Sequence, residues 1–595
     1  MDDLSNLSTA LQEILAAPEG SETLASTIEG YFLSSDIVTK KAVCETLLDI
    51  LNDGDAEHRA KQRDITLKET SLTYLPHLLP LSSSVPAAEE IVLLIAEHGN
   101  PREVVLGLSE GIQSIVDRAE GYQVSDNSDG GAFEDENEDD GNMDIDWPQL
   151  LEEYQVILRC FIIATPRLTN SKSTPTLLSL SESISNSLPV LAHQATTSSS
   201  RTLLRLLCEL VEVVWGWVQK TIDSGREQRA ILSNMLFESI TLLGHKVNAR
   251  LTERWFLRTF PKFQSMPTSQ AIVEVGIEGF KGGQEVLDLA WATAKKLDYT
   301  PADLIRKIVE PSHLSIHASL ASLNLLASQL AKNDLRQALS GTEVSPTLLD
   351  DGMPILCAAL SGSSVDAGIA YTWASVHHYS MNTDDSVEYD NASMLLELLV
   401  PLTAQHPSAL TRLALFKLIG SIISLLTTPN DKIQLFKQLL EPANPFDNIR
   451  IQSLSLLRES ISSKSKTVLS PLLAEVIFPV LFVFPEECDP EENPFYLTAP
   501  EMLESYWVSW WTECLALLWF ILDSDKGDLT TIRTNPKHDE RVKGWIKAVE
   551  GKLKEIQGFI STIGNDGDQQ EDEFSGVRFM VMRFEDALNR VKGLL

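Results

Sequence analysis

The sequence predicts an all-α protein in which helical hairpins stack into a solenoid. Two observations support this expectation, and a third marks an exception to it. Apolar residues recur at helical spacing along almost the whole chain, with no convincing run of the alternation that a half-buried strand requires. A two-helix pattern recurs in the C-terminal third of the chain. One long acidic segment marks the clearest break in the helical pattern.

The repeat is clearest where HPSALTRLALFKLIG, starting at His406, returns loosely as NPFDNIRIQSLSLLR. Pro407 and Pro445 stand 38 residues apart, and each is followed five positions later by an arginine, Arg412 or Arg450. Apolar residues then match in pairs: Phe416 with Leu454, Leu418 with Leu456, and Ile419 with Leu457. A two-helix unit of roughly 40 residues is the HEAT or armadillo period. Such units bury their apolar faces only by stacking, so the sequence predicts a HEAT/armadillo-like α-solenoid.

Individual helices are predicted from periodicity and from their start signals. Asp36 precedes one helical pattern as a capping residue, and Thr300 precedes another in which Pro301 takes the first helical position. Further helices are expected over residues 87–97, 147–163, 203–218, 231–243, 394–402, 410–425 and 506–522. The segment 203–218 has polar residues only at Arg205, Glu209 and Glu212 among its apolar ones, a pattern typical of a helix that packs on two sides.

The acidic segment, residues 125–146, carries ten acidic residues, three glycines and no basic residue. Such a composition cannot bury enough apolar surface to fold, so a disordered acidic insertion is predicted over 121–146. Its role is expected to be that of a solvated spacer, with a docking tail for a basic partner as the alternative. The predicted divisions are therefore N-terminal helical repeats over 1–120, the insertion, central repeats over 147–390, and C-terminal HEAT-like repeats with capping helices over 391–595.

Composition limits the class of partner. The chain has 595 residues, 43% of them apolar, and a formal net charge of −36. This charge disfavours nucleic acid and favours protein partners with basic or mixed surfaces. The six cysteines form no CxxC pair, and the first residues lack the basic segment of a secretory signal, so we expect a cytoplasmic protein, with the nucleus as a further compartment. Residues 506–522 are short for a membrane span and include Glu513, so a buried helix is expected there rather than a membrane contact.

No catalytic, cofactor-binding or metal-binding residue is predicted, because no hydrolase, phosphate-loop, zinc-protease or kinase motif occurs. Four glycines (Gly276, Gly279, Gly282 and Gly283) superficially resemble a phosphate loop, but they follow a helical pattern, which favours close helix packing. His313 and His317 have metal-ligand spacing without an evident third ligand. The expectation is thus a protein without enzymatic activity.

Candidate protein-binding residues lie in the C-terminal third, where aromatic residues are dense and an acidic loop adjoins them. Tryptophan and tyrosine dominate binding hot spots, although most rings of the helix over 506–522 are expected in the core. The predicted contact residues are the aromatic Phe495, Tyr496, Tyr506 and Trp507 and the acidic Glu486, Glu487, Asp489, Glu491 and Glu492. The basic segment over 536–554 is expected to pair with acidic residues of this same chain.

The order of these C-terminal features resembles a known family. The repeat NPFDNIRIQSLSLLRESI is followed by SPLLAEVIFPVLFVFPEE, an NPFY-containing loop and a Trp-rich helix ending LALLWFIL. Over residues 391–522 this order looks like the YAP-binding, ALF-type and glomulin family, and the acidic insertion suits a fungal member. The resemblance implies a HEAT-like solenoid without catalytic activity. Animal and plant members clasp the RING subunit of cullin–RING ubiquitin ligases, and fungal members are associated with a bZIP oxidative-stress transcription factor and with kinetochores.

The predicted function is therefore that of a non-enzymatic adaptor that binds, and masks or positions, a protein partner. Three alternatives remain open from the sequence. Nuclear transport receptors are acidic solenoids too, although none of the eleven tryptophans is followed by asparagine four positions on, as in importin-α ladders. A structural scaffold of a kinetochore or chaperone assembly would show the same sequence pattern. The third alternative is an enzyme of unfamiliar chemistry on a helical scaffold.

Overall fold

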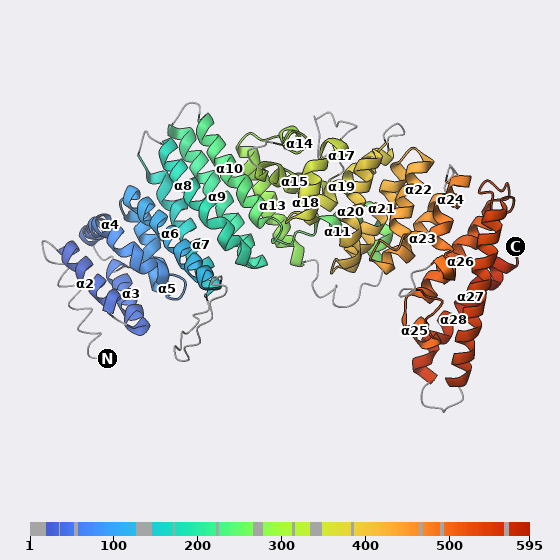
Figure 1. Ribbon diagram of the computed structural model, residues 1–595. Coiled ribbons are helices and arrows are strands. Elements are labelled where there is room, and N and C mark those ends of the chain that lie inside the picture. Colours follow the sequence, from blue (N-terminus) through green and yellow to red (C-terminus); the bar gives the residue numbers. More distant parts are fainter. Residues whose placement is uncertain are drawn as a thin grey trace. The chain divides into compact units, whose positions relative to one another are not determined.

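The computed structural model describes residues 20–34, 36–52, 57–126, 145–169, 173–221, 225–265, 278–311, 316–333, 348–381, 386–462, 468–487, 493–563 and 571–595. These residues form 25 α-helices and no strand (Figure 1). Four short 3-10 helices join them, at Leu79–Leu81, Thr165–Arg167, Pro261–Ser265 and Pro485–Glu487. The all-α prediction is confirmed. Residues 127–144 of the predicted insertion lie outside the described residues.

Contacts divide the chain into two compact units. Unit 1 comprises Met1–Val344 and Pro354–Tyr371, and unit 2 comprises Ser345–Met353 and Thr372–Leu595. The boundaries that the sequence suggested at 120, 146 and 390 stay predictions.

Unit 1 is built from two rows of helices. It contains α2 (Gly20–Ser34), α3 (Ile37–Asn52), α4 (Glu57–Leu78), α5 (Pro86–His98), α6 (Pro101–Asp126), α7 (Trp147–Ala164), α8 (Ser173–Gln194), α9 (Thr197–Thr221), α10 (Arg226–Leu243), α11 (Leu251–Thr259), α13 (Glu278–Lys296), α14 (Pro301–Val309), α15 (His317–Leu330) and most of α18 (Met353–Ser361). In one row α3, α5, α7, α9 and α13 pack in succession, and in the other α2, α4, α6, α8, α10 and α15 do so. Figure 1 shows α8, α9 and α10 side by side. This is the arrangement that stacked hairpins produce.

The sequence explains both the ends and the burial of these helices. The Asp36 carboxylate accepts a hydrogen bond from the Thr39 N–H at 2.8 Å, and Thr300 forms a capping box with Asp303. Helix α9 exposes Arg205 and Glu209 and buries most of its apolar residues, because α7 and α13 cover it from two sides. The expected helices over 87–97, 147–163 and 231–243 correspond to α5, α7 and α10.

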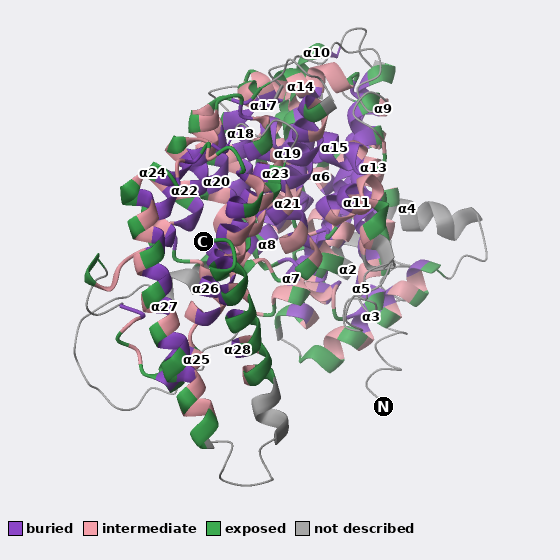
Figure 2. Ribbon diagram, turned by 90° about the vertical axis from the view of Figure 1, so that its right-hand side faces the viewer, coloured by how far each residue is buried: buried purple, intermediate pink, exposed green. Residues whose placement is uncertain are grey.

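Unit 2 continues the helical pattern to the end of the described chain. It contains α17 (Leu348–Asp351), most of α19 (Val365–Met381), α20 (Tyr389–Gln405), α21 (Ala409–Leu425), α22 (Pro429–Leu440), α23 (Asp447–Ser462), α24 (Pro471–Leu481), α25 (Ala499–Glu504), α26 (Trp507–Ser524), α27 (Pro536–Ile563) and α28 (Glu571–Lys592). Helix α22 packs on α24, α23 on α26, and α26 on α28. Figure 2 shows exposed residues along much of α28.

The sequence repeat corresponds to helices α21 and α23. All six paired apolar residues are buried, the most exposed being Phe416 at 8%. The two repeat arginines share one kind of contact, since each guanidinium donates to backbone carbonyl groups that precede its helix in the chain. Arg412 donates to the carbonyl of His406 at 2.7 Å, and Arg450 donates to that of Leu440 at 3.2 Å. The predicted repeat is therefore confirmed in packing and in hydrogen bonding.

Candidate protein-binding site

Helix α26 is the apolar centre of the candidate site. Trp510 and Trp511 are each 2% exposed, and the helix packs on α23 and α28. The expected buried helix is thus confirmed. Within the described part of the chain, no helix is long and apolar enough to cross a membrane.

The candidate aromatic residues gather at the N-terminal end of α26. Tyr506 and Trp507 stack with ring centroids 4.6 Å apart, and the Phe495 ring lies 4.9 Å from that of Trp511. Trp511 in turn lies 6.2 Å from Phe584 of α28. Phe495, Tyr506 and Trp507 are half-buried. Because these rings contact one another, they connect the loop before α25 to helices α26 and α28.

Arg450 of α23 orients Tyr506. Its guanidinium donates a hydrogen bond to the Tyr506 hydroxyl at 3.0 Å and lies 4.9 Å from the centroid of Trp510. The side chain of Arg450 is only 5% exposed. A buried guanidinium that faces aromatic rings and donates hydrogen bonds holds those rings in one arrangement.

The NPFY segment is a turn fixed by two polar residues. The buried Asn493 side chain donates to the carbonyl of Pro485 at 2.6 Å, and its oxygen accepts from the Phe495 N–H at 3.0 Å. Lys552 of α27 donates to the carbonyl of Phe495 at 3.3 Å and also to that of Leu497. The turn therefore rests on the packed helices. It presents Tyr496 to solvent with 69% of the residue exposed.

The acidic candidates divide into two groups. Glu486 and Glu487 are exposed, whereas Asp489, Glu491 and Glu492 lie outside the described residues. Arg541 of α27 holds Glu487 by two hydrogen bonds, at 2.9 and 2.8 Å. Partial burial opposes ionisation, but the bonds from Arg541 and from the Phe484 N–H outweigh it and lower the pKa of Glu487. The expectation that the basic segment pairs with this chain's own acidic residues is confirmed at Arg541.

The structure adds one aromatic residue that the sequence did not single out. Among the described residues, the exposed large apolar side chains include two aromatic ones, Tyr496 and Phe579, and both belong to unit 2. Phe579 lies on α28 away from the buried Phe584 and Leu588. In the sequence, Phe579 falls outside the apolar face of the predicted helix, and this position could have identified it as an exposed aromatic residue.

The motifs that could have carried chemistry have structural roles where they are described. Gly279, Gly282 and Gly283 lie on α13, and a Cβ atom at Gly283 would lie 2.3 Å from the Val247 carbonyl oxygen. Close packing against the Val247 backbone thus explains why residue 283 is a glycine. His317 begins α15, while Gly276 and His313 fall outside the described ranges. Over the described residues, no group of three or more side chains of metal-ligand type comes together.

Comparison with known proteins finds no family model that matches the chain and no curated protein that matches it.

Proposed function

We propose that this protein is a non-enzymatic adaptor whose unit 2 binds a protein partner and masks or positions it. The observation that carries the proposal is the NPFY turn. Tyr496 is 69% exposed, yet the backbone on both sides of it is held in place. The Phe495 N–H donates to the Asn493 side-chain oxygen, and Lys552 donates to the carbonyls of Phe495 and Leu497. An exposed tyrosine on a pre-ordered turn loses little conformational freedom on binding, which is typical of an interface hot spot.

The surroundings of Tyr496 support a basic or mixed partner surface. Glu486 is exposed beside the turn, and the chain as a whole carries a formal charge of −36. Opposite charge on a partner would speed its encounter with this region. The family resemblance suggests two partners to test first: the RING subunit of a cullin–RING ligase and a bZIP oxidative-stress transcription factor. Cytoplasmic and nuclear compartments both suit such partners.

The proposal is tested by affinity purification of the full chain followed by mass spectrometry, with Tyr496→Ala run in parallel. A hot-spot tyrosine contributes about 2 kcal/mol or more, so the affinity of the recovered partner should fall roughly 30-fold. The matched control is Leu529→Ala, which removes another exposed apolar side chain of unit 2 that is 52% exposed.

Two results would count against this function. Recovery of every bound protein in equal amounts with Tyr496→Ala would remove the turn from the interface. Turnover of a small-molecule substrate by the purified chain would remove the non-enzymatic assignment. Titration of the unaltered chain with the purified RING subunit and with the bZIP factor, each repeated with Tyr496→Ala, would distinguish the two named partners.

A further inference from the structure

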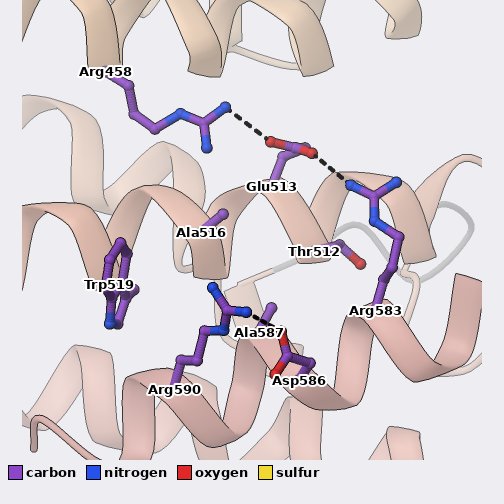
Figure 3. Close-up of a pocket in the computed structure, with 9 residues that line it drawn as sticks. All are labelled: Arg458, Thr512, Glu513, Ala516, Trp519, Arg583, Asp586, Ala587 and Arg590. Carbon is purple, nitrogen blue, oxygen red and sulfur yellow. Dashed lines mark hydrogen bonds and ion pairs between the residues drawn. The ribbon is translucent and has the colours of Figure 1, made fainter.

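An open cavity of about 360 Å³ lies between helices α23, α26 and α28 of unit 2 (Figure 3). Small side chains on α26 and α28, among them Ala516 and Ala587, make room for it. Trp519 lines it on one side. Three arginines from two different helices surround it: Arg458 of α23 and Arg583 and Arg590 of α28.

The charges around this cavity are not balanced. Glu513 accepts from Arg458 at 3.3 Å and from Arg583 at 3.4 Å, and Arg590 pairs with Asp586 at 2.8 Å. Three guanidinium groups thus face two carboxylates in a chain whose formal charge is −36. A local excess of positive charge is therefore built into an otherwise acidic protein.

The arginines also retain hydrogen-bonding capacity. A guanidinium has about five N–H donors and binds a carboxylate best in a bidentate pair with N–O distances of about 2.7–2.9 Å. Elsewhere in the described chain, Arg541 meets Glu487 in this way. At the cavity Arg458 and Arg583 share a single carboxylate through longer, single bonds. Arg583 and Arg590 are 57% and 60% exposed, so their remaining donors are accessible.

Two exposed apolar side chains lie beside the cavity, on the same face of α28 as its arginines. Phe579 and Met582 are 58% and 57% exposed. Phe579 lies one turn before Arg583, and Met582 lies one turn before Asp586, so these residues form one continuous strip. A ligand that fits the strip carries carboxylates for the arginines and an apolar side chain for Phe579 and Met582.

We propose that this groove, defined by Arg458, Arg583, Arg590, Trp519, Phe579 and Met582, docks a short acidic segment of a partner protein that also carries an apolar residue. The inference rests on the proposed adaptor function and deepens it. The overall negative charge repels strongly acidic proteins at long range, so the partner is neutral or basic as a whole and acidic only in this segment. Charge complementarity at the groove then selects the segment that enters it.

The test uses the full chain and a random peptide library displayed on phage. Selected peptides should combine aspartate or glutamate with a neighbouring apolar residue. Their affinity should fall about ten- to hundredfold for Arg583→Gln and for Arg590→Gln, because each change removes a charge-assisted hydrogen-bond donor. Arg578→Gln is the matched control: it removes the same charge from an exposed position of α28 that does not line the cavity.

Several outcomes would overturn the docking proposal. Selected peptides without acidic residues, or acidic peptides that bind Arg583→Gln as tightly as the unaltered chain, would do so. A several-fold gain in peptide affinity after deletion of residues 127–144 would instead assign the groove to this chain's own acidic segment. The partner whose binding depends on Tyr496 can also be titrated with the double variant Arg583→Gln, Arg590→Gln. If its affinity is unchanged, this inference fails while the adaptor function stands.

Discussion

Arg118 of α6 holds the buried carboxylate of Glu153 of α7 by two hydrogen bonds, both 2.7 Å long. Only 1% of the Glu153 side chain is exposed. Burial raises the pKa of Glu153 above its ordinary value of 4.5, although the hydrogen bonds and the charge of Arg118 oppose that rise. The folded protein therefore keeps this proton to a higher pH than the unfolded chain does. The contribution of Glu153 to the free energy of unfolding falls as the pH rises above 4.5 through the raised pKa.

Replacing Arg118 by methionine should leave a buried, unpaired carboxylate. We expect a loss of about 3–5 kcal/mol in the free energy of unfolding at neutral pH. The loss should shrink as the pH falls toward 4.5, because Glu153 then takes up a proton. Denaturant titrations at about pH 8 and about pH 5.5 measure the difference. The double variant Arg118→Met, Glu153→Leu should recover most of the stability, and a cost independent of pH would contradict this account.

Gly283 of α13 should not tolerate a side chain. Its Cβ would lie 2.3 Å from the Val247 carbonyl oxygen and 2.9 Å from that of Asn248, and both are backbone atoms that cannot move aside cheaply. Gly283→Ala should therefore destabilise unit 1 by about 1–3 kcal/mol in thermal or denaturant unfolding. Gly216→Ala on α9 is the control. Nothing lies within 4 Å of its Cβ position, so helix propensity should make it neutral or stabilising by up to about 1 kcal/mol.

The two repeat arginines should differ in their contribution to stability. Arg450 is buried and bonds Leu440, Asp447 and Tyr506, whereas Arg412 is half-buried and bonds only backbone carbonyls in the described chain. Arg450→Ala should lower the free energy of unfolding by about 2–4 kcal/mol. It should also shift the tryptophan fluorescence, because a charge next to Trp510 is lost. Arg412→Ala should cost about 1 kcal/mol. Equal costs would mean that the contacts of Arg450 with the aromatic rings contribute nothing.

Lys552 should control the order of the NPFY turn without touching a partner. It is 6% exposed and donates to the carbonyls of Phe495 and Leu497. Lys552→Met should speed amide hydrogen exchange at Tyr496 and Leu497 and weaken partner binding, because the turn must then be ordered on binding. Lys554→Met is the control. Its side chain is 72% exposed and pairs with Glu550, so the substitution should change the free energy of unfolding by no more than about 0.5 kcal/mol.

Much of the fold could be predicted because its signals are local. Helical periodicity located α9 and α26, and the paired residues around Arg412 and Arg450 identified the repeat. The groove could not be predicted in the same way. Arg458, Glu513 and Arg583 come from three helices, and which ones meet depends on how α23, α26 and α28 pack. Glu513 within an apolar helix was the one local sign of it.

For the candidate site, sequence reasoning located the region but not the role of each ring. Aromatic density next to acidic residues predicts a contact role for both Tyr496 and Trp507, because the residue type alone does not show which side chain is exposed. The structure separates them. Tyr496 is exposed at the turn, whereas Trp507 stacks on Tyr506 and is half-buried. Tertiary packing determines this difference in exposure, and the spacing of residues in the sequence does not predict it.

Phe584 of α28 packs against Trp511 of α26, so one helix both covers this tryptophan and supplies two arginines of the groove. A premature stop codon ahead of α28 would uncover a strongly apolar surface at the same moment that it abolished the docking groove. Shortened products of this chain should therefore be cleared by cellular quality control or aggregate, instead of persisting as dominant-negative fragments.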